Sequence, residues 1–354
     1  MKPHSIAAVQ GAGKSAPRGD NGPGMRRAAA LLLASFALGQ DKDGPAESRL
    51  DEGNRKAAEE VRRTFAREGT DLAAQLRGLR KEDLIVVGGL FDFVQEVLTA
   101  HRVGHTVITP AELEHHPLPE PERKVFVLNC HLIDRTFTAS MPPHARATDG
   151  EADRTLERVI AEAGLEGDTS PGKAIRDRFA EVKHFAGSDY TERGLARLGD
   201  AVRAGAWAMS TDWAVLVWEK ALPRTLRWTG RTTFEETIEV QPALAGRRHA
   251  LLEGVFLEPK ARWWIETESY LFAVEGRHTV LVDSTQLGAR YGGNRNVVVL
   301  AEAGKGQVLH ALAHAYLVRG KERDLCAMQK LLVNLLLAKS LANVKKGGAG
   351  GSGD

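Results

Sequence analysis

The chain alternates short apolar runs with helical segments, and this order constrains the fold more than any other feature. Four apolar runs predict buried strands, at 84–87, 106–109, the stretch that ends at Asn129 and Cys130, and 206–210. Helical patterns occupy 91–101, 191–204 and 212–222. Strands that are apolar along their whole length are usually covered on both faces, as in parallel sheets. The sequence therefore predicts an α/β fold in which a mostly parallel sheet has helices on both faces.

The rest of the chain completes a large domain with appended ends. Strand-like runs continue at 225–228, 236–240, 263–266, 270–274, 279–283 and 296–301, and a final amphipathic helix covers 323–341. We divide the chain into a leader (1–39), an N-terminal helical extension (40–82), the α/β domain (83–342) and a flexible tail (343–354). The domain contains an expected insertion at 135–190, where the apolar pattern loosens. The charged helix of the extension is expected to be exposed on most sides.

The leader has the three-part layout of a secretory signal. Arg26 and Arg27 precede the apolar run 28–38, and small residues surround Gly39. The run is too short to span a bilayer. We therefore expect translation from Met25, export to the periplasm or the exterior, and no transmembrane segment in the mature chain. An earlier segment, AVQGAGKS, resembles a phosphate-binding loop but lacks its first glycine, and no strand precedes it.

Composition narrows the range of partners. The 48 Lys and Arg residues nearly balance the 46 Asp and Glu residues, and the formal net charge of +2 gives no indication of nucleic-acid binding. Only two cysteines occur, Cys130 and Cys326, which permit at most one disulfide and no Cys-rich metal site. We interpret them as two buried thiols. No cofactor or metal is expected, and the expected partner is a small molecule, a glycan or a protein.

The segment GAWAMSTDWAV at 205–215 has the outline of a nucleophile elbow. In such elbows a strand ends at a sharp turn, the turn exposes one side chain, and a helix begins at once. Ser210, Thr211 and Asp212 occupy the turn. They are either catalytic, through a serine or a carboxylate, or they cap the helix. We predict that Asp212 caps it, since its carboxylate can accept hydrogen bonds from the free amides of the first turn.

Four segments resemble the class I glutamine amidotransferase-like superfamily, in particular its ThuA-like members: IVVGGLFDFVQEVL, VFVLNC, LGDAVRAGAWAMSTDWA and GKGQVLHALAHAYL. The resemblance covers most of 84–341 and implies a flavodoxin-like layered fold. Active members carry an elbow of the form G-x-C-x-G, and a late histidine followed by Pro-Glu assists the cysteine. This chain has no elbow cysteine, and Ala315 and Tyr316 stand where Pro-Glu belongs. The resemblance therefore implies a domain without the amidotransferase nucleophile.

Two groups of residues are candidates for a site. His314 is the candidate base, because it follows a late strand where the resemblance places the catalytic histidine. His310 lies four residues earlier, which suggests a helical metal pair, but the intervening residues lack the Glu of H-E-x-x-H and begin as a strand. Ligands of open α/β sheets bind at the carboxyl ends of the strands. The ligand-binding candidates there and in nearby loops are Asn129, Cys130, His131, Thr211 and Tyr291.

The sequence leaves three functions open. We favour an exported, non-catalytic domain that binds a ligand or a partner, because the elbow lacks its cysteine. The alternative is a hydrolase or carbohydrate-processing enzyme related to ThuA-like proteins, using Ser210 or Asp212 with His314. A third possibility is a structural role in which the N-terminal helix docks the domain into an assembly. A hydroxyl or carboxylate within hydrogen-bond reach of His314 would distinguish the enzyme.

Overall fold

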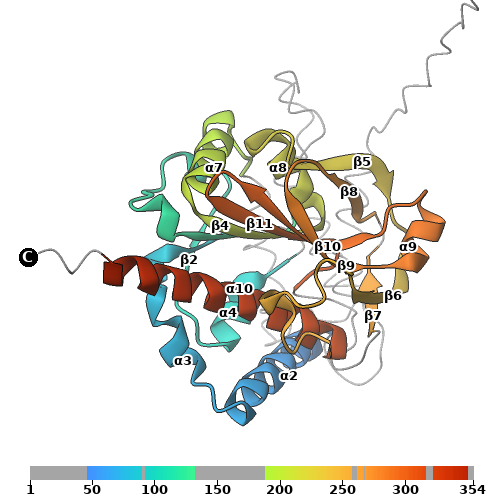
Figure 1. Ribbon diagram of the computed structural model, residues 1–354, viewed down its shortest axis with the longest axis horizontal. Coiled ribbons are helices and arrows are strands. Elements are labelled where there is room, and N and C mark those ends of the chain that lie inside the picture. Colours follow the sequence, from blue (N-terminus) through green and yellow to red (C-terminus); the bar gives the residue numbers. More distant parts are fainter. Residues whose placement is uncertain are drawn as a thin grey trace, which may run out of the picture.

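The computed structural model describes residues 46–89, 92–131, 188–256, 261–266, 268–315 and 322–349 (Figure 1). Its centre is a nine-stranded sheet with the order β2-β1-β3-β4-β11-β10-β9-β6-β7. The first five strands in this order are mutually parallel: β2 (Thr106–Ile108), β1 (Leu84–Val87), β3 (Val125–Leu128), β4 (Trp207–Thr211) and β11 (Gly306–Ala311). The other four extend the sheet with antiparallel pairings: β10 (Asn296–Ala303), β9 (His278–Asp283), β6 (Glu236–Pro242) and β7 (Ala261–Ile265). A separate two-stranded sheet pairs β5 (Leu226–Thr232) with β8 (Tyr270–Val274).

Helices cover both faces of the large sheet. On one side lie α7 (Glu192–Ala204) and α8 (Val215–Ala221), and on the other lie α10 (Glu322–Ala349), α2 (Ala46–Arg67) and α4 (Val94–Ala100) (Figure 1). Shorter helices are α3 (Leu72–Gln75) and α9 (Thr285–Arg290). Single 3₁₀ turns occur at Leu76–Gly78, Lys81–Asp83, Glu112–Glu114, Pro121–Arg123, Asp212–Ala214 and Ala250–Leu252. The predicted α/β layered fold is confirmed.

The apolar runs of the sequence correspond to buried strands at the centre of the sheet. Every residue of β1 and of β3 is buried, because helices cover both faces of these central strands. Gly205 closes α7 with a φ of 130°, in the region that favours glycine, and β4 starts two residues later. Helix α4 begins at Val94, three residues after the predicted start at 91, and β2 ends at Ile108.

Helix α2 has one buried face, which the expectation of an extension exposed on most sides did not include. Its residues Ala57, Ala58, Val61 and Phe65 are buried, and they form a stripe with helical spacing. This stripe packs against α10, where the ammonium of Lys330 lies 3.3 Å from the centre of the Phe65 ring. The many charged residues on the other faces of α2 hid this narrow apolar stripe. The extension is therefore part of the packed structure, in contact with the last helix.

Helix α10 also runs further than expected, to Ala349 instead of 341, so the predicted flexible tail from 343 is helical at its start. Along the part of the chain that the structure covers, no helix is both long enough and apolar enough to cross a membrane. The leader at 1–39, with the predicted export signal, lies outside the described residues, as does nearly all of the insertion expected at 135–190.

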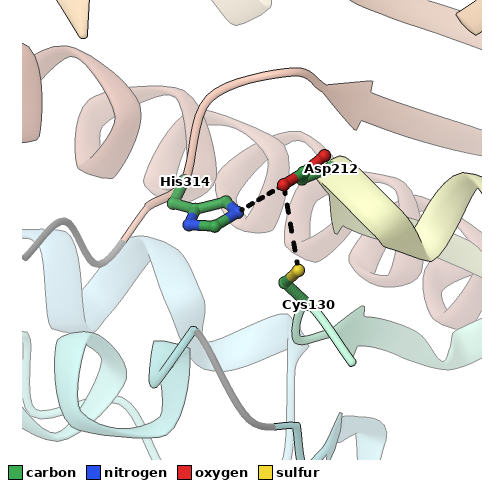
Figure 2. A group of neighbouring side chains, drawn as sticks. All are labelled: Cys130, Asp212 and His314. Atoms are coloured by element: carbon green, nitrogen blue, oxygen red, sulfur yellow. Dashed lines mark hydrogen bonds and ion pairs between the residues drawn. The ribbon is translucent and has the colours of Figure 1, made fainter. Parts of the chain in front are cut away.

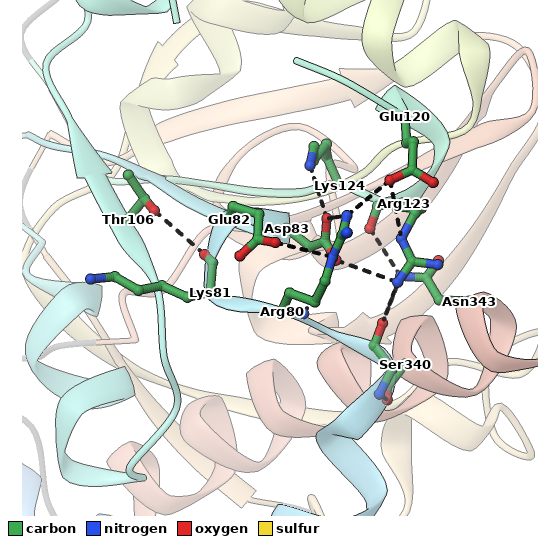
Figure 3. Close-up of polar contacts among 11 residues, drawn as sticks. Arg80, Lys81, Glu82, Asp83, Thr106, Glu120, Arg123, Lys124, Ser340 and Asn343 are labelled. Carbon is green, nitrogen blue, oxygen red and sulfur yellow. Dashed lines mark hydrogen bonds and ion pairs between the residues drawn. The ribbon is translucent and has the colours of Figure 1, made fainter. Parts of the chain in front are cut away.

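A network of charged and polar groups joins α10 to the start of the sheet (Figure 3). Asp83 precedes β1 and Lys124 precedes β3; both are fully buried, and the Lys124 Nζ lies 2.8 Å from the Asp83 Oδ1. Arg80 donates two hydrogen bonds of 2.9 Å to the same carboxylate. Although burial opposes the charged form, the hydrogen bonds from Arg80 and Lys124 hold the pKa of Asp83 well below its usual range.

The helix contributes two polar side chains to this network. Ser340 Oγ accepts a hydrogen bond from the Gly78 amide at 2.9 Å, and Asn343 donates to the carbonyl oxygens of Gly78 and Arg123. A Cβ on residue 78 would lie 2.2 Å from the Ser340 carbonyl oxygen, so this close approach requires glycine. The network fixes α10 against the amino-terminal edge of the sheet, opposite the strand ends described next.

Candidate functional site

Three adjacent parallel strands bring their carboxyl ends to one edge of the sheet. Strand β4 pairs with β3 on one side and β11 on the other, with Ser210 opposite Leu128 and Thr211 opposite Ala311. Residues that directly follow these strands are therefore neighbours across the sheet. This is the edge at which open α/β sheets bind ligands.

Asp212 occupies the tip of the elbow between β4 and α8. Its φ is 43°, in the left-handed region that non-glycine residues rarely adopt, and a 3₁₀ turn over Asp212–Ala214 leads directly into the helix. Such strain of about 1–3 kcal/mol persists where the surrounding structure enforces it, and it is common at functional sites. The strand-to-helix turn predicted from the sequence is therefore present, with the carboxylate of Asp212 at its strained position.

The predicted capping role of Asp212 is wrong. No side chain caps either the 3₁₀ turn or α8. The Asp212 Oδ1 instead accepts a 2.6 Å hydrogen bond from the Tyr270 amide, at the start of β8. The left-handed backbone turns the carboxylate away from the helix amides and toward the neighbouring strand ends.

Cys130, Asp212 and His314 converge at this edge (Figure 2). The His314 Nε2 lies 3.3 Å from the Asp212 Oδ2, and the Cys130 Sγ lies 4.0 Å from the same oxygen. On its other side, His314 Nδ1 is 3.6 Å from the Glu266 Oε2. All three residues of the cluster are buried, and the Glu266 side chain, 25% exposed, connects them to the surface. We call Cys130, Asp212 and His314 the edge cluster.

Burial and the charges of neighbouring groups shift the pKa of all three groups of the edge cluster. Burial raises the pKa of the Asp212 carboxyl. Burial also raises the pKa of the Cys130 thiol to about 12, and the Asp212 charge adds to the effect. For His314 burial opposes the charged form, but Glu266, Asp212 and Cys130 outweigh it and raise the pKa well above its usual value. Strongly perturbed groups in one cluster are a mark of functional sites.

Ser210 is not part of the edge cluster. It is fully buried, its Oγ lies 2.9 Å from the His310 Nδ1, and it accepts a 2.7 Å hydrogen bond from the Trp218 indole. His310 lies within β11 and packs edge-on against the Phe272 ring. Burial lowers the pKa of His310 to about 3. The serine therefore has a structural partner other than His314, and His310 and His314 do not form a helical pair.

Two of the remaining candidates, Asn129 and Thr211, make hydrogen bonds that support a loop. The Asn129 side chain accepts from the Val94 amide and donates to Gln95, and Thr211 donates a 2.7 Å hydrogen bond to Asp92. Both therefore hold the segment that leads into α4. His131 directly follows Cys130 in the sequence, and its Nε2 lies 3.1 Å from the Ser188 carbonyl oxygen. Burial lowers the pKa of His131 to about 4.

Tyr291 is not brought to the edge cluster by any described contact. Its hydroxyl accepts from the Phe234 amide at 3.0 Å and donates to the Glu236 carboxylate at 2.9 Å, at the end of α9. Gly292 and Gly293, both in left-handed conformations, directly follow Tyr291. Tyr291 thus supports the β6 side of the sheet.

Sequence reasoning missed the residues that surround the edge cluster. Glu266 follows β7 and Tyr270 begins β8, and neither belongs to a recognisable motif. The Tyr270 ring stacks on Trp228 at 4.7 Å between ring centres and contacts Trp213 at 5.5 Å. The only sequence signal was the concentration of tryptophans between 207 and 264. This aromatic row borders the carboxylate at the elbow.

The two cysteines form no disulfide with each other, and they differ in surroundings. Cys130 is 1% exposed, whereas Cys326 is half-buried beside Ala57 of α2. Because the raised pKa keeps Cys130 in the unreactive thiol form, we expect a small alkylating reagent at neutral pH to modify Cys326 first. Mass spectrometry of tryptic peptides, after labelling of the native protein, measures both rates. Faster labelling of Cys130 than of Cys326 would contradict this prediction.

No protein-family model and no curated protein matches the chain. Solved structures with a similar fold include a protein named after the A subunit of GMP synthase from Thermoplasma acidophilum, with a TM-score of 0.42, 7% identity, and coverage of 75% of this chain and 98% of that one. A glutamine amidotransferase from Thermotoga maritima has a TM-score of 0.38 and 8% identity, with coverage of 74% of this chain and 99% of that one. A ThuA-like protein from Bacteroides uniformis has a TM-score of 0.35 and 10% identity, with coverage of 71% of this chain and 87% of that one. These similarities concern the fold alone.

Proposed function

We propose that this chain is an exported hydrolytic enzyme in which the Asp212–His314 pair activates water. One observation carries the proposal: a carboxylate at a strained strand-to-helix elbow lies 3.3 Å from a buried imidazole. That distance supports a hydrolase over a non-catalytic domain of the same fold. Ser210, the other candidate nucleophile, is bonded to His310 and Trp218 and has no part in the proposal.

The pair supplies both an acid and a base. The Asp212 carboxylate accepts a proton from a water molecule as the water oxygen bonds to the carbonyl carbon of an ester or amide. The protonated His314 donates its proton to the leaving oxygen or nitrogen as that bond breaks. Transfer of the proton from Asp212 to His314 then restores the starting state. The raised pKa of the Asp212 carboxyl makes its carboxylate a stronger base, and the raised pKa of His314 favours the charged imidazolium that donates the proton.

The surroundings favour access from the Glu266 side. Glu266 is the partly exposed neighbour of the buried imidazole, and Trp213 and Trp228 are half-buried next to Tyr270. Aromatic faces at the rim of a site can pack against the apolar or sugar portion of a substrate. The Tyr270 amide, which holds Asp212 by a 2.6 Å hydrogen bond, keeps the carboxylate oriented for proton transfer.

A screen for turnover tests this function. Purified mature protein is assayed with chromogenic ester, amide and glycoside substrates, and we expect hydrolysis of at least one ester or amide. Absence of turnover in every class would favour the second candidate, a non-catalytic binding domain. The observation on its side is that Cys130, Asp212 and His314 are only 1%, 3% and 2% exposed.

Export is a separate part of the proposal, supported by the basic residues, apolar run and small residues of the leader. We expect the mature chain to begin near Gln40. Amino-terminal sequencing of the protein secreted by its native host, or by a bacterial host that expresses the full reading frame, measures this. Mature protein that retains residues upstream of 28 would contradict export by cleavage.

A further inference from the structure

We infer that the edge cluster is a binding site for one divalent transition-metal ion of the zinc type, with Cys130 Sγ, Asp212 Oδ2 and His314 Nε2 as its ligands. The inference rests on the proposed function, since the ion would occupy the same site; when it is bound, His314 Nε2 and Asp212 Oδ2 would be ligands, and the ion would take over the activation of water. It also revises the expectation from sequence that no metal site is present.

The donor atoms already lie close to the spacing that such an ion requires. Zinc binds sulfur at about 2.3 Å and nitrogen or oxygen at about 2.1 Å, so tetrahedral donors stand roughly 3.4–3.6 Å apart. Here the nitrogen–oxygen distance is 3.3 Å and the sulfur–oxygen distance is 4.0 Å. Each of the three residues offers a ligand atom within 4.8 Å of the others. Shifts of a few tenths of an ångström to about one ångström would complete the geometry.

The donor set is chemically selective. A thiolate, an imidazole and a carboxylate together suit zinc and similar borderline ions, whereas magnesium and calcium prefer oxygen ligands alone. Three protein ligands leave the fourth tetrahedral position for water, as in catalytic rather than structural zinc sites. With a neutral imidazole, the thiolate and the carboxylate carry two negative charges, which balance a divalent ion.

The groups around the ligands are arranged as supports for a metal site. Glu266 lies 3.6 Å from the second ring nitrogen of His314, and the Tyr270 amide binds the other oxygen of Asp212. Histidine ligands of metals commonly place their second nitrogen next to a carboxylate, which fixes the ring and strengthens the donor. Neither nitrogen of the buried His314 ring is aligned for a hydrogen bond within the described structure, despite the nearby oxygens. An ion between the three donors would satisfy the nitrogen that faces Asp212.

Titration of the metal-free full-length mature protein tests the inference. Zinc binding is followed by calorimetry and by metal content after gel filtration, and cobalt binding by the thiolate-to-cobalt charge-transfer absorption. We expect one equivalent of either ion. Cys130→Ser, Asp212→Asn and His314→Gln should each weaken zinc binding by at least about 100-fold, and Cys130→Ser should abolish the charge-transfer band. Glu266→Gln should weaken binding by about 10- to 100-fold.

Matched controls separate the site from adventitious binding. Cys326→Ser and His278→Gln change the second cysteine and an exposed histidine, and both should bind zinc like the wild type. Variants are compared only where circular dichroism shows a folded protein, and zinc should raise the Tm of the wild type but not of His314→Gln or Asp212→Asn. No stoichiometric binding, or unchanged binding in Cys130→Ser and His314→Gln, would overturn the inference.

The readouts also keep the two proposals apart. Metal binding is measured without any substrate, so bound zinc without turnover would contradict the hydrolytic function alone. Turnover that survives complete chelation, in protein that binds no metal, would contradict the metal site alone.

Discussion

Replacing Asp83 by Ala is expected to lower the free energy of unfolding by about 3–5 kcal/mol. The Lys124 ammonium is fully buried 2.8 Å from this carboxylate, and removing the carboxylate leaves a positive charge in the interior without its counter-charge (Figure 3). Breaking a buried pair by removing one partner typically costs this much, because desolvation of the remaining ion is no longer offset. Urea denaturation at pH 7, followed by circular dichroism, measures the change.

Two comparisons sharpen the prediction. Glu120→Gln breaks the exposed contact of Glu120 with Arg80 at 3.0 Å, and it should cost no more than about 1 kcal/mol. The double variant Asp83→Leu/Lys124→Met removes both buried charges and should be more stable than Asp83→Ala. A loss below about 1 kcal/mol for Asp83→Ala would show that the pair does not hold the amino-terminal edge of the sheet.

The same pair predicts how stability depends on pH. The pKa of Asp83 is lower in the folded state than its unfolded value of about 3.9. Its contribution is therefore fully present above the unfolded pKa and is lost as the pH falls through that value toward the folded pKa. The stability difference between wild type and Asp83→Ala should be constant from pH 7 to about pH 5 and shrink below about pH 4.

Replacing Asp212 by Asn, or His314 by Gln, is expected to lower kcat/KM by about 10²- to 10⁴-fold for whichever substrate the wild type hydrolyses. General acid–base groups contribute factors of this size. Asn keeps the oxygen that can accept the Tyr270 amide hydrogen bond but cannot take a proton from water. Steady-state kinetics of the purified variants measures the loss, and the double variant should be little worse than either single one, because the two residues act as a unit.

Controls distinguish catalysis from folding. Asp200→Asn changes an exposed carboxylate that contacts Arg203, and it should leave kcat/KM unchanged. Ser210→Ala removes the partner of two buried groups, His310 and Trp218. It should therefore lower stability by about 1–3 kcal/mol while the folded fraction keeps its activity. Wild-type kcat/KM in a folded Asp212→Asn protein, or loss of activity in folded Ser210→Ala, would contradict the assignment.

The layered fold and the edge where the site lies could be predicted from the sequence. The buried strands are visible as apolar runs, because a strand covered on both faces excludes polar side chains along its whole length. Helix ends are visible where the backbone demands a particular residue, as at Gly205. Since parallel strands share one carboxyl edge, residues after the third and fourth strands had to lie near one another, and Cys130 and Asp212 do.

Only the tertiary structure determined which groups these residues contact. Asp212 lies 82 residues from Cys130 in sequence, and its distances to Cys130 and His314 depend on strand register and on the left-handed turn at the elbow. A local pattern favoured a helix cap there, because capping needs only neighbouring residues, whereas the actual partner of the carboxylate is the Tyr270 amide. The partner of the buried stripe of α2 was likewise determined only by the tertiary structure, in which the stripe packs against α10. Hydrophobic periodicity records which residues are covered, but the partners of a buried polar group are set by contacts distant in sequence.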